Sequence, residues 1–213
     1  WMKNRFLKLA PWAAAAAPIV VWIRSWRGWT DLDHCPYIGC DFVVFYRQAL
    51  SLFRHPTVIE ADWFYPPMAA VLFAIFRPFP PVPALVAWSV INVALAVVLA
   101  VFCARELKRS GRRMTWATAA GLAALSLPVM HSIKWGQISL LIVIGSIVAL
   151  RRRTRLAEIL FGFVIALKLY PVVYLIGPLA RRQWKKTITV LVAAFVCGLV
   201  IPLAVLKAEA TGA

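Results

Sequence analysis

Residues Val82–Cys103 read VPALVAWSVINVALAVVLAVFC, a run in which no side chain is charged. A helix of about 20 mostly apolar residues crosses the hydrocarbon core of a bilayer, so this run is long enough to span a membrane. Hydrophobic residues make up 62% of the 213-residue chain and charged residues 15%, against about 45–50% and about 25% in soluble domains. Other apolar runs lie at Leu9–Ile23, Met68–Phe76, Trp116–Val129, Ile138–Leu150, Leu156–Leu167, Leu169–Ala180 and Thr187–Leu206. The pattern predicts an all-α, polytopic transmembrane protein, with residues 1–213 in a single transmembrane domain.

The distribution of basic residues argues against nucleic-acid binding, although the net charge is +16. Basic side chains are concentrated in short connections between apolar runs, at positions 3–8, 105–113, 151–155 and 181–186. Cytoplasmic loops of membrane proteins carry such an excess of lysine and arginine. Five of the eight acidic residues lie instead between positions 24 and 65. We therefore predict that the basic clusters are cytoplasmic and that residues 24–65 form an extracytoplasmic loop.

This orientation constrains the apolar runs that are too short to span. Met68–Phe76, bracketed by prolines, is predicted to dip into the membrane from outside without crossing it. The segment Leu156–Ala180 has two interpretations: two half-helices broken near Lys168, or one tilted helix kinked at Pro171. The single helix would place the basic turn 181–186 outside, against the charge rule. We therefore expect the two half-helices, and we interpret Leu9–Ile23 as a retained signal-anchor helix.

Neither a metal site nor a nucleotide-binding motif is predicted. The four cysteines lack zinc-site spacing, and the chain contains no Walker A loop and no dinucleotide-binding fingerprint. Cys35 and Cys40 share the predicted outer loop, where they form either a disulfide or two unbonded thiols. The sequence therefore indicates chemistry that uses neither a metal nor an organic cofactor.

Residues Phe42–Arg54 of the outer loop have helical periodicity. Apolar Phe42, Phe45, Tyr46, Ala49 and Phe53 share one face, and Arg47, Gln48, Ser51 and Arg54 populate the other. This pattern predicts an amphipathic helix on the outer membrane surface. Asp41 stands at its predicted N-cap, where a carboxylate accepts backbone N–H groups. Asp41 is either only a cap or also a general base at the membrane interface.

Three further motifs place polar groups on the same predicted side of the membrane. Tyr65 precedes Pro66-Pro67, and Lys134 lies in the polar connector His131–Gln137. An ordinary proline entry and an interhelical turn explain these two without a function, although Lys134 is suited to meet a lipid-linked phosphate as a point charge. Lys168 has about a dozen apolar residues on each side, and a charge at that depth is costly and usually faces a cavity. Lys168 is expected to bind phosphate or pyrophosphate oxygens, with snorkelling to the interface as the competing explanation.

Together these motifs resemble glycosyltransferase family 87 of the glycosyltransferase-C superfamily. The resemblance is carried, over about residues 36–186, by Asp41-Phe42, Phe64-Tyr65-Pro66-Pro67-Met68, Gly136-Gln137 and Lys168-Leu169-Tyr170-Pro171. It implies a helical bundle of the glycosyltransferase-C type whose active site faces outside the cytoplasmic membrane. The donor implied is a polyprenyl-phosphate-linked sugar, typically mannose, and the acceptor a lipid or a glycan. The reaction implied inverts the anomeric centre.

The resemblance also implies roles for individual residues. Asp41 matches the acidic residue of the family's first outer loop, which is expected to deprotonate the acceptor hydroxyl as the catalytic base. Lys168 matches the family's intramembrane lysine and is expected to stabilise the departing phosphate. The other substrate-binding residues expected in the cavity are Tyr65, Gln137, Lys134 and Arg47.

Members of the family are longer than this chain, so we interpret it as the N-terminal part of a larger glycosyltransferase that need not be active by itself. Two other classes fit the same spans. One is a transporter or flippase-like module with Lys168 in a broken helix, and the other is a non-catalytic membrane fragment. We see no inverted repeat in the sequence, which weighs against the transporter.

Overall fold

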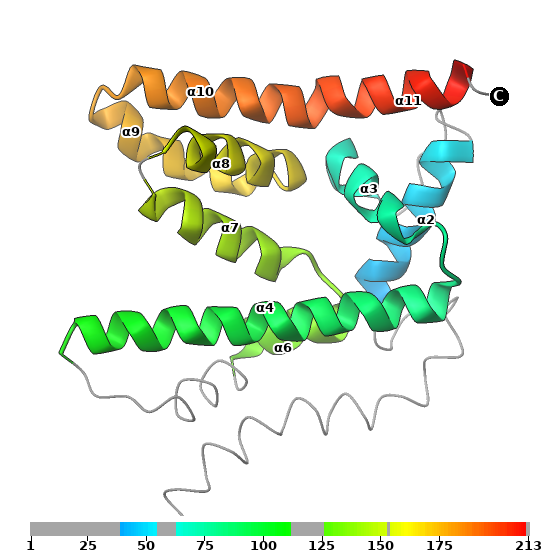
Figure 1. The fold of residues 1–213 in the computed structure, drawn as a ribbon, viewed down its shortest axis with the longest axis horizontal. Helices are drawn as coiled ribbons and strands as arrows, with labels where there is room; N and C mark the ends of the chain where they lie inside the picture. Colours follow the sequence, from blue (N-terminus) through cyan, green and yellow to red (C-terminus); the bar gives the residue numbers. More distant parts are fainter. Residues whose placement is uncertain (1–38, 55–62, 112–125, 153, 212–213) are drawn as a thin grey trace, which may run out of the picture. The chain divides into compact units, whose positions relative to one another are not determined.

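The computed structural model of the chain describes residues 39–54, 63–111, 126–152 and 154–211, and the elements in these ranges are helical (Figure 1). In chain order they are α2 (Cys40–Arg54), α3 (Pro67–Phe73), η2 (Ala74–Phe76), α4 (Pro81–Arg109), α6 (Leu127–Trp135), α7 (Ser139–Arg151), α8 (Arg155–Leu167), η3 (Tyr170–Leu175), α9 (Ile176–Ala180), α10 (Trp184–Phe195), η4 (Val196–Val200) and α11 (Ile201–Thr211). The elements η2 and η3 are 3₁₀ turns and η4 is a π-helical segment. The expectations for Leu9–Ile23, for Cys35, for most of the acidic outer loop and for most of Trp116–Val129 lie outside the described residues.

The described residues fall into two compact units. The first contains residues 39–43, 81–111 and 126–141, which are the first turn of α2, all of α4 and α6, and the start of α7. The second contains residues 44–54, 63–80, 142–152 and 154–211, which are the rest of α2, α3, η2, most of α7 and every later element.

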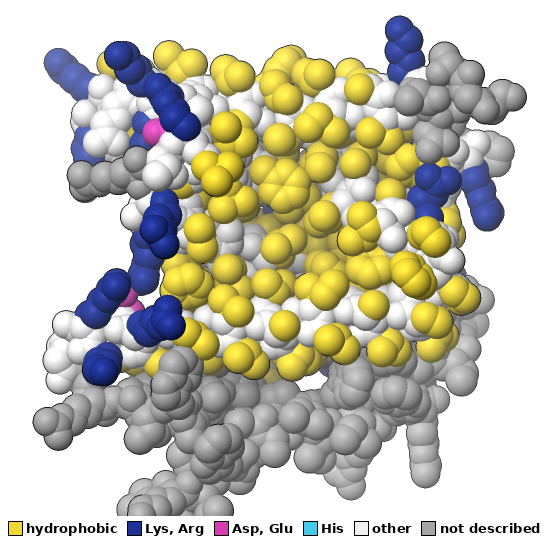
Figure 2. Space-filling model, viewed as in Figure 1, with side chains coloured by type: hydrophobic (Ala, Val, Ile, Leu, Met, Phe, Trp, Pro, Cys, Tyr) yellow, Lys and Arg dark blue, Asp and Glu magenta, His cyan; other side chains and the backbone are white. Residues whose placement is uncertain are grey.

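In the first unit, α4 has the length and composition of a membrane-spanning helix. Its 29 residues extend about 43 Å at 1.5 Å per residue, which exceeds the ~30 Å hydrocarbon core. Val90 and Val97 are exposed, and Figure 2 shows apolar side chains along the visible face of this helix. Lys108 and Arg109 occupy its last turn. The prediction that Val82–Cys103 is long and apolar enough to span is confirmed.

Helix α6 packs against α4. The buried cluster contains Val129, Ile133 and Leu140, against which Leu95, Ala96 and Leu99 pack. The expectation of a polar connector over His131–Gln137 is wrong, because α6 continues to Trp135 and ends at Gly136. Ser132 and Ile133 are buried, so packing against α4 outweighs the local polarity that suggested a connector.

In the second unit, α8 and α10 lie against each other. Phe161, Ile165 and Val190 belong to one buried cluster. Gly162 is necessary for this contact, since a Cβ there would come within 2.5 Å of the Ala193 Cβ. Residues Trp184–Lys207, which comprise α10, η4 and most of α11, form a second segment of spanning length. The prediction of a span near Thr187–Leu206 is therefore also confirmed by length and composition.

The chain breaks at Lys168 as expected. Helix α8 ends at Leu167, and the backbone of Lys168 is extended, with φ −158° and ψ 125°. After the break, η3 folds back along α8, because Leu175 joins the buried cluster that contains Phe161 and Ile165. A single kinked helix over Leu156–Ala180 is therefore not what the chain forms.

Helix α2 packs closely on the short helix α3. The rings of Phe45 and Phe73 stack with centroids 4.6 Å apart, and the Tyr46 hydroxyl donates to the carbonyl of Phe79 over 2.8 Å. The predicted apolar face of α2 is mostly buried, but Gln48, assigned to its polar face, is buried as well at 3% exposure. The simple two-faced pattern is therefore wrong at Gln48, because α2 is covered over more than one stripe.

Candidate functional site

In the first unit, a hydrogen bond joins the start of α2 to the end of α6. The backbone N–H of Gly39 donates to the carbonyl of Lys134 over 2.7 Å. Helix α2 begins at Cys40, so Asp41 lies inside the first helical turn and not at the expected N-cap. Helix boundaries vary by one or two residues, and a carboxylate in the first turn still meets the partial positive charge of the helix N-terminus. The structure thus brings the half-buried Asp41 and Lys134 into one neighbourhood.

Gly136, at the end of α6, packs against the first turn of α2. Its φ of 68° ends α6 in the left-handed conformation, and a Cβ there would come within 2.8 Å of the Phe42 Cβ. The indole Nε1 of Trp88 donates to the Gly136 carbonyl over 2.7 Å. Two independent requirements therefore select glycine: the backbone conformation and the close approach of α2.

Gln137 follows directly and is held by its neighbours. Its backbone N–H donates to the Ser132 carbonyl over 2.9 Å, and its Oε1 accepts a hydrogen bond from the Ser139 hydroxyl over 3.1 Å. The side chain is half-buried. Gln137 lies in the same unit as Asp41 and Lys134, and its role as a substrate ligand stays a prediction.

Three buried polar groups in this unit were missed by the sequence reasoning. Within the described part of the chain, Ser89 Oγ, Asn92 Oδ1 and Trp135 Nε1 are buried without a hydrogen-bond partner. Ser89 and Asn92 are almost fully buried. Ser89 and Asn92 could have been found from the sequence, because they are polar, three positions apart and inside a long apolar helix. Polar groups inside a membrane segment usually face the protein interior.

In the second unit, the side chain of Lys168 lies next to the ring of Tyr65. The ammonium Nζ of Lys168 lies 5.1 Å from the centroid of the Tyr65 ring and 5.7 Å from that of Tyr170. Both distances are within the range of a cation–π interaction. Lys168 also follows the last residue of α8, where exposed carbonyl groups favour a cation. Lys168 is therefore held by two aromatic rings and a helix terminus.

An aromatic cluster supports Tyr65. Its ring lies 4.6 Å from that of Phe45 and 5.8 Å from that of Trp63, measured between centroids. Phe45 stacks in turn on the buried Phe73. Edge-to-face and stacked aromatic pairs each contribute about 0.5–1.5 kcal/mol beyond area burial. These ring contacts hold Tyr65, the aromatic partner of Lys168, in place against α2 and α3.

The remaining predicted residue, Arg47, is exposed on α2 in the second unit. Asp41, Lys134 and Gln137 belong to the first unit, whereas Lys168 and Tyr65 belong to the second. The meeting of a carboxylate and an ammonium group in one cavity therefore stays a prediction. Among the described residues, no three His, Cys, Asp or Glu side chains gather as a metal site would require.

Residues 63–213 match the model of glycosyltransferase family 87. The match covers more than half of the chain and includes Tyr65, Lys134, Gln137 and Lys168, whereas Asp41 and Arg47 precede it. Searches of curated proteins and of solved structures found no match.

Proposed function

Because this chain belongs to glycosyltransferase family 87, a family of membrane glycosyltransferases, we propose that it moves mannose from a polyprenyl-phosphate donor to a lipid or glycan acceptor. In this proposal the reaction takes place at the outer face of the cytoplasmic membrane and inverts the anomeric carbon. The observation that carries the proposal is the ammonium group of Lys168, held at a break between two apolar helices and inside the segment that matches the family.

The leaving phosphate needs a positive partner near the membrane. When the bond between the anomeric carbon and the phosphate oxygen breaks, negative charge develops on the polyprenyl phosphate. A fixed cation in a site of low dielectric stabilises such charge strongly. The two rings that flank Lys168 hold its ammonium in place, so little reorganisation is needed during the reaction.

The acceptor hydroxyl must lose a proton while it attacks. We assign Asp41 as the base: its carboxylate takes the hydroxyl proton, the acceptor oxygen bonds to the anomeric carbon, and the phosphate leaves with the electron pair of the broken bond. Helix α2 carries Asp41 in its first turn, close to the partial positive charge of the helix N-terminus.

Two observations support an outward-facing site. Cys40, next to Asp41, is disulfide-bonded, and disulfides persist in oxidising compartments. In the second unit, α8 starts at Arg155 and ends before Lys168, so its 13 residues separate the basic cluster from Lys168 by about 20 Å. Since the basic clusters mark the cytoplasmic side, Lys168 lies toward the opposite one.

The test is sugar transfer by membranes that contain the natural full-length protein. They are incubated with radiolabelled polyprenyl-phospho-mannose and with extracted lipids and glycans as acceptors. The proposal predicts a mannosylated product with inverted configuration and release of polyprenyl phosphate. Movement of the donor across the membrane without covalent transfer would instead identify a flippase and refute the proposal.

The Asp41 assignment is tested with Asp41→Asn, which keeps the size of the side chain and removes its basicity. We expect transfer to fall by about 10²–10⁴-fold, the usual contribution of a general base, while membrane insertion is unchanged. Glu106→Gln is the matched control, because Glu106 is an exposed carboxylate that pairs with Arg109 at 3.7 Å. Normal transfer by Asp41→Asn would exclude Asp41 as the base.

A further inference from the structure

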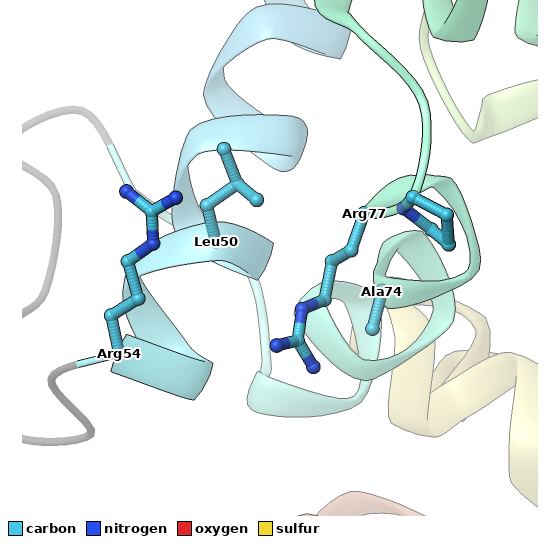
Figure 3. Close-up of a pocket in the computed structure, with 5 residues that line it drawn as sticks. Leu50, Arg54, Ala74 and Arg77 are labelled. Carbon is cyan, nitrogen blue, oxygen red and sulfur yellow. The ribbon is translucent and has the colours of Figure 1, made fainter.

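The second unit contains a pocket that shares no residue with the candidate site. It is lined by Leu50 and Arg54 of α2, by Ala74 of η2 and by Arg77 and Pro78, which follow η2, and its volume is about 380 Å³. Figure 3 shows Leu50 and Arg54 extending from α2, with Ala74 and Arg77 on the facing segment. Two guanidinium groups therefore border an otherwise apolar pocket.

The two walls of this pocket are tied together by side-chain contacts. The guanidinium carbon of Arg77 lies 4.0 Å from the centroid of the Phe53 ring on α2. The Tyr46 hydroxyl of α2 donates to the carbonyl of Phe79 over 2.8 Å. One contact orients Arg77 itself and the other fixes the turn that follows it, so the pocket is largely formed before any ligand binds.

The pocket lies in the unit that contains one of the two segments of membrane-spanning length. Helix α3 contacts η4 and α11, which form the C-terminal half of the Trp184–Lys207 span. The basic turn Arg181–Lys186 lies at the other end of that span.

The surface next to Arg77 is apolar. Ile75 is 61% exposed and Phe79 is 52% exposed. In a membrane-embedded unit, such side chains are suited to contact acyl chains, while a neighbouring guanidinium binds phosphate through paired N–H donors. The pocket has an apolar lining formed by Leu50, Ala74 and Pro78.

We propose that the Arg54–Arg77 pocket binds the phosphate group of an anionic glycerophospholipid, with the acyl chains along Ile75 and Phe79. The proposal rests on membrane embedding and on the geometry of this pocket, and it does not require sugar transfer. A test of lipid binding therefore fails or succeeds independently of the glycosyltransferase assay.

The experiment is a lipid titration of the natural full-length protein in detergent, followed by native mass spectrometry. Phosphatidylglycerol is compared with phosphatidylcholine of the same acyl chains. We expect phosphatidylglycerol to bind about tenfold more tightly to the wild type, and Arg54→Gln/Arg77→Gln to lose this preference. Arg152→Gln/Arg181→Gln removes two exposed arginines elsewhere in the unit and is expected to keep it.

A lysine variant and a phosphate competitor test how the pocket recognises the lipid. Arg54→Lys/Arg77→Lys keeps both charges without the planar fork, so we expect an intermediate preference. Inorganic phosphate at the lipid concentration is expected to displace little lipid, and complete displacement would show that the pocket takes free phosphate instead. Equal binding of the two lipids by the wild type, or equal loss in the control pair, would overturn the proposal. Single Arg54→Gln and Arg77→Gln variants replace the double variant if it does not fold.

Discussion

Replacing Gly136 with alanine should loosen the join between α2 and α6. Gly136 has φ 68°, and for a residue with a Cβ this conformation costs about 1–2 kcal/mol. The added Cβ would also lie 2.8 Å from the Phe42 Cβ and 3.5 Å from the backbone nitrogen of Phe42. Because both neighbours belong to a packed helix, relief requires movement of α2, and such overpacking costs about 1–3 kcal/mol. The expected loss of unfolding free energy is therefore about 2–5 kcal/mol.

The chain offers a matched control for this substitution. Gly111 has φ 79° and nothing within 4 Å of an added Cβ, so Gly111→Ala introduces only the conformational cost. Equilibrium unfolding in mixed micelles titrated with SDS should show Gly136→Ala to be less stable than Gly111→Ala by about 1–3 kcal/mol. Sugar transfer should also fall in Gly136→Ala, since α2 carries Asp41. Equal stability of the two variants would refute the close packing of Phe42 on Gly136.

Two further predictions concern stability. Gly162→Ala places a Cβ 2.5 Å from the Ala193 Cβ and 2.7 Å from the Val190 carbonyl oxygen, so it should lower the unfolding free energy by about 1–3 kcal/mol in the same assay. Gly177→Ala, with nothing within 4 Å of the added Cβ, should be close to neutral. A similar loss of stability in both variants would contradict the α8–α10 contact. Trp88→Phe removes the buried donor to the Gly136 carbonyl and should destabilise the protein by about 1–3 kcal/mol, whereas wild-type stability would show that this hydrogen bond contributes nothing.

The spans were predictable from local composition, whereas the break at Lys168 was predicted because a single helix would place the basic turn 181–186 outside. A long uncharged run such as Val82–Cys103 can be buried in lipid without tertiary information. Pro171, three residues after Lys168, lacks the backbone N–H group that a continuous helix needs at this position. The structure confirms the break and adds that η3 folds back on α8 through Leu175.

The errors occur where tertiary packing decides the outcome. His131, Ser132 and Lys134 suggested a connector, but the burial of Ser132 and Ile133 against α4 extends α6 through them. Gln48 was placed on a polar face because the amphipathic pattern assumes that only one face of a helix is buried, whereas α2 is covered on more than one side. No local pattern predicts such multiple coverage.

The contact between Tyr65 and Lys168 also depends on tertiary packing. The two residues are about a hundred positions apart in the chain. The charge pattern placed both on one side of the membrane and the resemblance placed both in the cavity, but neither predicted the 5.1 Å distance between the ammonium and the ring. The buried polar groups of Ser89 and Asn92 were missed because a helix with two polar residues still has the hydropathy of a membrane span.

The most direct test of the account measures mannose transfer by Lys168→Gln at saturating donor and acceptor. If Lys168 stabilises the departing phosphate, kcat should fall by about 10²–10³-fold with a smaller change in KM. Lys168→Arg should recover part of the rate, and Lys185→Gln, which removes an exposed lysine at the start of α10, should leave it unchanged. A wild-type kcat in Lys168→Gln would contradict the central role of this lysine.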